Sequence, residues 1–276
     1  MSGFERVAFI GGAGMMGRAL VEGLLQEGVI AADKLTVTAR SGKSLGRLES
    51  LGVITTLDNC AAVANADVVV LAVHPDQALP CLTACAAAFR PDQLLISVVT
   101  AMSVAKLRRA AGGRTPVVRA MPNIAATVRA SVTTLTFGTE VTEEQLAFAV
   151  QLFGVVGDVI PVDEKHLNAC TGLGACGPAF AFKMIESLAE GGVKMGLPRD
   201  VSRRMAAGVL RGAAELVLKT GKHPAELKDE VTTPGGCTID GIAKLEERGL
   251  PIALIAAVEV STRKAAELDA SADIEQ

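Results

Sequence analysis

The chain has 276 residues, half of them hydrophobic, with 27 basic and 30 acidic side chains and a net charge of −3. This length predicts two compact domains, each with its own core. Because the charges are nearly balanced and form no long block of one sign, we expect neither a nucleic-acid nor a membrane-surface partner. Aromatic residues are scarce, so small aliphatic side chains must build both cores.

Targeting and metal-binding patterns are not evident. The N-terminal residues lead directly into an apolar strand without the features of a signal peptide, which predicts a cytoplasmic location. The best membrane-span candidate, residues 250–258, is far too short. The six cysteines have no spacing typical of metal ligands, so we expect reduced thiols and no metal site.

The first half of the chain alternates β-branched runs with helical patterns, which is typical of βαβ units and a parallel sheet. We therefore predict an α/β fold with a Rossmann-type doubly wound sheet over residues 1–162. Two of the predicted strands flank a helix that opens with a capping box at Thr142–Gln145. The predicted strands cover residues 7–10, 35–38, 53–54, 67–73, 94–99, 117–121, 131–136 and 155–162.

The pattern becomes helical from residue 163, which predicts an all-helical second domain over residues 163–276. Its helix after Pro198 is rich in small side chains that would let another helix approach closely. That helix could lie within the same chain or in a second copy, and the pattern leaves both interpretations open. The small residues are Ala206, Ala207, Gly208, Gly212, Ala213 and Ala214.

A glycine-rich turn follows the first predicted strand and opens a helix. Its sequence, Gly11-Gly12-Ala13-Gly14-Met15-Met16-Gly17, matches G-x-G-x-x-G at Gly12, Gly14 and Gly17. In this motif the glycines permit the tight turn, the approach of the pyrophosphate and close helix–strand packing. The segment predicts a dinucleotide site, with Met15 and Met16 at the helix N-terminus that faces the phosphates.

The ends of two further strands refine this prediction. The second strand is followed by Arg40, Ser41 and Lys43, which suit the 2′-phosphate of NADPH, although solvated loop residues are the alternative and NADH stays possible. After the fourth strand comes Ala72-Val73-His74-Pro75, at the sheet edge where ligands of such folds bind. His74 either contacts the cofactor or is an ordinary histidine of the loop. We assign it no role in proton transfer.

A second glycine turn lies in the helical half, within Thr233-Pro234-Gly235-Gly236-Cys237-Thr238. Such a turn at a helix N-terminus presents backbone N–H groups that suit a carboxylate, and Thr233 and Thr238 add hydroxyl groups. Ordinary capping of the helix by Thr238 is the alternative for an isolated segment.

The order of motifs along nearly the whole chain resembles that of the pyrroline-5-carboxylate reductase family. Members combine a Rossmann domain with a helical dimerisation domain, and their active site forms between two subunits. The resemblance therefore implies a homodimer or a higher assembly of dimers. It rests on the glycine turn, Leu71–Pro75, Val118–Asn123, Gly177–Phe180, Gly196–Pro198 and Thr233–Thr238.

This resemblance implies a role in proline biosynthesis, in which NADPH reduces a cyclic imine carboxylate, 1-pyrroline-5-carboxylate, to L-proline. Carried over by position, Thr233, Gly235 and Gly236 would hold the substrate carboxylate. Thr238 would hydrogen-bond the imine nitrogen and orient the substrate or relay a proton, because a threonine hydroxyl is a poor acid. Asn123 would lie near the nicotinamide.

Several positions depart from the family pattern. His74 stands where Lys is usual, Thr100-Ala101 where Ala-Gly is usual, and Cys237 where Thr is usual. The stretch Gly174–Phe180 lacks two serines and a tyrosine hydroxyl of the family pattern. Reduction of another cyclic imine, a substituted pyrroline or a six-membered analogue, is therefore the alternative. A nucleotide-binding protein without chemistry and a hydroxy-acid dehydrogenase are the remaining alternatives.

Overall fold

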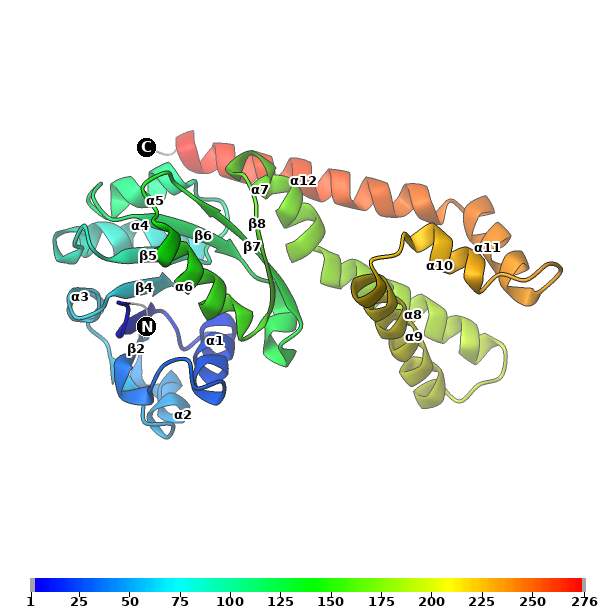
Figure 1. The fold of residues 1–276 in the computed structure, drawn as a ribbon, viewed down its shortest axis with the longest axis horizontal. Coiled ribbons are helices and arrows are strands. Elements are labelled where there is room, and N and C mark those ends of the chain that lie inside the picture. Colours follow the sequence, from blue (N-terminus) through cyan, green and yellow to red (C-terminus); the bar gives the residue numbers. More distant parts are fainter. Residues whose placement is uncertain (1–2, 275–276) are drawn as a thin grey trace. The chain divides into compact units, whose positions relative to one another are not determined.

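The chain folds into two compact units. Figure 1 shows the computed structural model, which describes residues 3–274, with side chains to residue 270. The first unit contains the residues up to 175 and those after 260, and the second contains residues 176–260. The boundary predicted between residues 162 and 163 stays a prediction.

The first unit is built on one sheet of eight strands in the order β3-β2-β1-β4-β5-β6-β7-β8. All neighbouring strands are parallel except β6 and β7. Every predicted strand is present, and the predicted doubly wound Rossmann-type fold is confirmed. The strands are β1 Val7–Ile10, β2 Leu35–Thr38, β3 Ile54–Thr56, β4 Val68–Leu71, β5 Leu94–Ser97, β6 Val117–Met121, β7 Ser131–Phe137 and β8 Gly157–Pro161.

Helices cover the two faces of this sheet, and each face has its own apolar cluster. Successive strand residues point to opposite faces, so Phe9 of β1 packs into one cluster and Ile10 into the other. The first cluster includes side chains of α1 and α6, and the second includes those of α3, α4 and α5. The helices of this unit are α1 Met15–Gln26, α2 Gly46–Glu49, α3 Asn59–Ala64, α4 Pro75–Ala84, α5 Val104–Ala110, α6 Glu143–Gly154 and α7 Leu167–Cys170.

Helix α6 begins with the predicted capping box. The Thr142 hydroxyl accepts a hydrogen bond from the backbone N–H of Gln145, and the Gln145 side chain accepts one from the backbone N–H of Thr142. Two N–H groups that the helix cannot satisfy are thereby satisfied locally. The helix connects β7 to β8, as the sequence predicts.

The second unit is a thin assembly of helices. Ser202 of α9 donates a hydrogen bond to the Ala189 carbonyl of α8 at 2.6 Å, and these two helices pack together. Within residues 176–260 only Ser202 and Ala206 are buried. No strand follows residue 163 in the described part of the chain, as predicted. The helices are α8 Gly177–Lys194, α9 Arg199–Thr220, α10 Pro224–Glu230, α11 Cys237–Glu247 and α12 Leu250–Ile274, the last of which ends in the first unit.

Large apolar side chains lie exposed on this unit. They include Phe182, Met205, Val209, Leu216, Ile252 and Ile255, each at least half exposed. Exposed large apolar side chains in such number are typical of an interface with another subunit.

In the described residues no helix has the length and apolarity needed to cross a bilayer.

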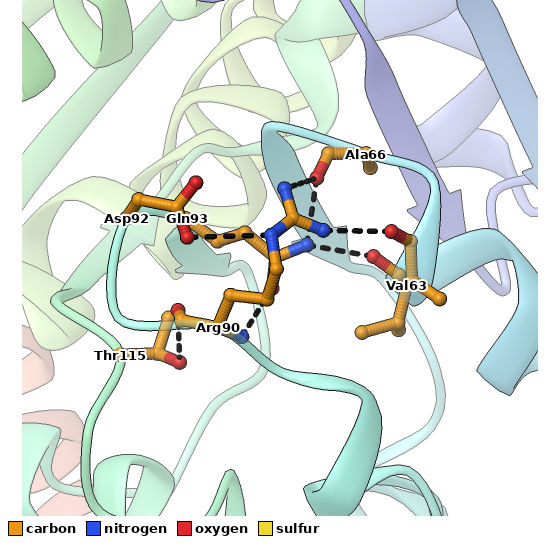
Figure 2. A network of polar contacts seen from close by, with 7 residues as sticks. Val63, Ala66, Arg90, Asp92, Gln93 and Thr115 are labelled. Atoms are coloured by element: carbon orange, nitrogen blue, oxygen red, sulfur yellow. Dashed lines mark hydrogen bonds and ion pairs between the residues drawn. The ribbon is translucent and has the colours of Figure 1, made fainter.

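A polar network at the amino end of β5 ties this strand to the end of α3 (Figure 2). The Gln93 amide is fully buried and donates to the carbonyls of Val63 and Ala66 at 2.7 and 2.6 Å. Its oxygen accepts from the backbone N–H of Arg90 at 2.7 Å. The Arg90 guanidinium donates to the carbonyls of Ala64 and Ala66. These bonds satisfy backbone groups at a sharp reversal of the chain.

The network predicts unequal effects of two neighbouring substitutions. Gln93→Leu should lower the free energy of unfolding by about 2 kcal/mol, because it leaves the backbone N–H of Arg90 without a partner and takes one hydrogen bond from each of the Val63 and Ala66 carbonyls. Asp92→Asn removes only the negative charge from an exposed 3.3 Å contact with Arg90 and should change the free energy of unfolding by less than about 0.5 kcal/mol. Urea denaturation monitored by circular dichroism measures both, and equal effects would contradict the role given to Gln93.

Candidate active site

The glycine turn after β1 has the close contacts that its motif predicts. A Cβ atom at Gly12 would lie 2.5 Å from Cβ of Phe9, and one at Gly17 would lie 2.4 Å from the Gly12 carbonyl oxygen. Gly11 has a φ of 73°, in the region that glycine tolerates best. Its N–H donates to the Thr38 hydroxyl of β2 at 3.0 Å, which fixes the turn against the neighbouring strand.

Gly14 differs from the other glycines of the turn, because its surroundings are open. A Cβ at Gly14 would approach the Gly11 carbonyl oxygen at 3.8 Å, and no other protein atom would lie nearer. Gly14 is also the N-cap residue of α1, with no side chain capping the helix. The first N–H groups of α1 therefore face open space, as a pyrophosphate requires. The residues present fit a dinucleotide.

The end of β2 places Arg40 and Ser41 beside this turn. Both are exposed, and Ser41 is the N-cap of the short helix at Gly42–Ser44. In the described part of the chain the guanidinium of Arg40 forms no ion pair and the ammonium of Lys43 forms none either. An exposed cation that the protein does not neutralise is available for a phosphate group.

The end of β4 lies next to the turn, at the point where the strand order reverses between β1 and β4. A Cβ at Gly11 would come within 2.6 Å of the Val73 side chain, so the two connections are in close contact. His74 is the N-cap of α4, and Pro75 is its first residue. Nδ1 of His74 lies 2.6 Å from the Asp76 carboxylate, and both side chains are exposed.

Asp76 contacts the candidate site residue His74, and the sequence analysis did not single it out. The carboxylate fixes the orientation of the His74 ring, so that Nε2 is the nitrogen left for a ligand. The detectable signal was the spacing His-Pro-Asp at a helix N-terminus, where an acidic residue in the first turn reaches back to the N-cap.

Asn123 follows β6 and connects three segments. Its Oδ1 accepts from the backbone N–H of Ala125, and its Nδ2 donates to the Gly174 carbonyl, both at 3.0 Å. Its backbone N–H donates to the Ser131 hydroxyl at 3.0 Å. The side chain therefore organises the carboxyl edge of the sheet in this structure. Its predicted place near the nicotinamide stays a prediction.

The second glycine turn separates α10 from α11 in the helical unit. Gly235 has a φ of 69°, and a Cβ at Gly236 would lie 2.5 Å from the Thr233 hydroxyl. The N-cap of α11 is Gly236, and no side chain caps the helix, so Thr238 does not play the capping role considered as the alternative. Among the described residues, the exposed hydroxyls of Thr233 and Thr238 have no hydrogen-bond partner in the protein.

The structure thus gathers the predicted residues into two sets. The cofactor set lies at the carboxyl ends of β1, β2, β4 and β6, in one unit. The substrate set lies on the single turn at Thr233–Thr238, in the other unit.

Two family models match different parts of the chain. Residues 164–268 match the model for pyrroline-5-carboxylate reductase dimerisation, and residues 6–101 match the model for NADP oxidoreductase, coenzyme F420-dependent. The pyrroline-5-carboxylate reductase of Thermus thermophilus is 40% identical over 270 residues, which cover 96% of this chain and 99% of that protein.

Two solved structures are similar over almost the full length. A pyrroline-5-carboxylate reductase from Coxiella burnetii superposes with a TM-score of 0.91 at 33% identity, covering 96% of this chain and 98% of that one. The pyrroline carboxylate reductase of Plasmodium falciparum, solved with NADP bound, gives a TM-score of 0.86 at 27% identity, covering 98% of this chain and 99% of that one.

The fold and the glycine turn define an NAD(P)H-dependent oxidoreductase with a Rossmann-type unit and a helical dimerisation region. The relatives covering nearly the whole chain narrow this class further. The chain belongs to the pyrroline-5-carboxylate reductase family. Its dimerisation region and exposed apolar helices make it a homo-oligomer.

Two substitutions in the glycine turn should separate cofactor binding from packing. Gly14→Ala adds a methyl group where the protein leaves space, so the melting temperature should hold while NADPH binding weakens about tenfold or more. Gly17→Ala pushes a methyl group onto Gly12 and should lower the melting temperature as well. Thermal unfolding and NADPH fluorescence titration test this, and unchanged NADPH affinity in Gly14→Ala would refute the proposed phosphate site.

Proposed function

We propose that the turn at Thr233–Thr238 binds the imine substrate of this enzyme and that the glycine turn after β1 binds its cofactor. The reaction is that of the family: NADPH-dependent reduction of 1-pyrroline-5-carboxylate to L-proline. The observation that carries the assignment is the unpartnered pair of threonine hydroxyls beside a helix N-terminus that no side chain caps.

The cofactor is NADPH, which supplies the hydride when it is bound. The backbone N–H groups of Met15 and Met16 at the start of α1 hold the pyrophosphate, because Gly14 leaves room for it. Arg40 and Ser41 hold the 2′-phosphate at the end of β2. Ala72, Val73, His74 and Pro75 line the neighbouring edge.

The substrate carboxylate is held at the second turn. Gly235 adopts a left-handed conformation, and the N–H of Gly236 closes the turn by donating to the Thr233 carbonyl at 3.0 Å, which leaves the N–H groups of the first residues of α11 open. These N–H groups and the Thr233 hydroxyl form a binding site for an anionic group. The Thr238 hydroxyl hydrogen-bonds the imine nitrogen and orients the ring, so that the C=N carbon receives the hydride. A hydroxyl can also relay a proton to that nitrogen without ionising on its own.

We assign the two domains and the subunit interface on the same basis. Residues 1–162 form the cofactor domain, and residues 163–276 form the substrate-binding and dimerisation domain. Two chains associate through the exposed apolar side chains of α8, α9 and α12, because too little of the surface of these side chains is buried within one chain. The enzyme works in the cytoplasm on a small molecule, without nucleic-acid or membrane partners.

A second candidate substrate is a six-membered or substituted cyclic imine carboxylate. It is supported by the stretch Gly174–Phe180, which lacks the hydroxyl side chains usual in the family. A substrate group left without these partners would lose about 1–3 kcal/mol of binding each, unless the ring differs.

Steady-state kinetics with Thr238 variants test the substrate site. Wild-type protein should oxidise NADPH with 1-pyrroline-5-carboxylate, whereas turnover only with a six-membered imine acid would favour the second candidate. Thr238→Ala should lower kcat/KM for the imine about 10- to 100-fold, as expected for one lost hydrogen bond, with the KM for NADPH unchanged. Thr238→Ser keeps the hydroxyl and serves as the control. Full activity in a folded Thr238→Ala protein would remove this residue from the site.

Cofactor selectivity tests the end of β2. Arg40→Ala should raise the KM for NADPH about tenfold or more, because it removes a charge-assisted contact with the 2′-phosphate. The KM for NADH, which lacks this phosphate, should change less than twofold. Arg6→Ala is the matched control, since it removes an equal charge from an exposed residue that precedes β1, at the opposite edge of the sheet. An equal rise in KM for both cofactors would show that Arg40 does not bind the 2′-phosphate.

A further inference from the structure

A buried cation lies in the sheet at a place that the chemistry described above does not use. Arg119 is the third residue of β6, and its side chain is only 3% exposed. Its neighbours in register are Ser97 of β5 and Thr136 of β7. Within the described residues, Nε of Arg119 and the hydroxyl of Thr136 form no hydrogen bond. A guanidinium keeps its charge in a protein, so it needs compensating negative charge here.

Two carboxylates from distant parts of the chain supply that charge. Asp269, near the end of α12, places Oδ1 3.8 Å from Nη2 of Arg119. Glu164 acts on the same guanidinium: burial lowers the pKa of Arg119, while the charges of Asp269 and Glu164 raise it. Glu164 is itself held, because its Oε1 accepts from the backbone N–H of Val104 at 2.8 Å, at the start of α5.

These two carboxylates lie at the two ends of the region that matches the dimerisation family. The dimerisation region spans residues 164–268, so Glu164 is its first residue and Asp269 follows its last. The chain leaves the first unit after residue 175 and returns to it at residue 261. The segments containing Glu164 and Asp269 are therefore the two connections of the helical unit to the sheet. Both carboxylates belong to the unit that contains Arg119.

Strand β6 holds the outgoing connection at a second point. Asn123, just beyond the strand, donates through Nδ2 to the Gly174 carbonyl at 3.0 Å. Strand β6 and the residue that follows it thus contact the outgoing segment at Gly174 and the returning helix at Asp269. The same strand leads into the carboxyl edge where the cofactor residues lie.

We propose that Arg119 is a positioning residue for the reductase reaction, because its buried guanidinium anchors Asp269, and hence the returning connection of the helical unit, to strand β6. The helical unit carries the turn at Thr233–Thr238, so the inference rests on the substrate site proposed above. Arg119 itself touches neither substrate nor cofactor in this role. Loss of the anchor releases the chain segments on which the substrate turn depends and leaves the glycine turn of β1 intact.

Hydrogen exchange gives a test that does not depend on activity. In Arg119→Met, peptides covering residues 261–270 should exchange at least tenfold faster than in the wild type, and peptides of α1 should be unchanged. Arg109→Met is the matched control, because Arg109 is exposed on α5 and its side chain forms no ion pair among the described residues. Unchanged exchange at residues 261–270 would overturn the anchor, whatever the outcome of the Thr238 experiments.

Kinetics then test positioning. Folded Arg119→Met should retain NADPH affinity within twofold, measured by fluorescence, while kcat/KM for the imine falls at least tenfold. Arg119→Lys should recover part of this loss. If Arg119→Met does not fold, Asp269→Asn and Glu164→Gln, which change only charge, should each give a smaller loss in the same parameter. Loss of NADPH affinity in proportion to kcat/KM, or unchanged kcat/KM in every folded variant, would overturn the proposal.

A double-mutant cycle distinguishes the effect of the Arg119–Asp269 interaction from a general loss of stability. Arg119→Met combined with Asp269→Leu replaces the buried arginine and its partly buried partner by apolar side chains, a change that often leaves stability unharmed. The melting temperature should therefore recover relative to Arg119→Met, and the losses in kcat/KM of the two single variants should not multiply. Simple multiplication of the two effects would show that the residues act independently and would overturn the anchor.

Discussion

The close approach of helix α1 to strand β1 is the constraint on which the cofactor half of the molecule depends. Gly17 rests on the backbone of Gly12 at a separation that no side chain could enter. This contact places the N-terminus of α1 at the carboxyl end of β1, beside the reversal of strand order between β1 and β4. The Val73 side chain then closes against Gly11, which brings the start of α4 to the same edge. The cofactor site follows from packing of the backbone.

Much of this half could be predicted from the sequence, because its signals are local. Short β-branched runs marked every strand, the glycine spacing marked the turn, and Thr142 with Gln145 marked the start of α6. The edge strand β3 was placed near residues 53–54 and lies at Ile54–Thr56, because exposed strand residues give a weak apolar pattern. Interactions between distant segments were not predictable in this way. The Arg119–Asp269 pair joins residues 150 positions apart, and no local pattern marks it.

The candidate substrate site was only partly accessible to the same reasoning. The glycines of the second turn indicated a helix N-terminus, but the sequence alone did not decide whether Thr238 capped it. The backbone decides this point, since Gly236 takes the N-cap position and leaves the hydroxyl free. One departure from the family pattern also gains a physical meaning. Ala101 has a φ of 58°, a conformation that costs an L-residue about 1–2 kcal/mol. The glycine usual at this position would avoid that strain.

The thinness of the helical unit has a consequence for the life of the chain in the cell. With only Ser202 and Ala206 buried among residues 176–260, one copy gains little free energy by ordering these helices alone. Folding of this part and association with another copy are therefore a single thermodynamic event, governed by the concentration of the chain. The amount of enzyme expressed thus sets its stability as well as its total activity.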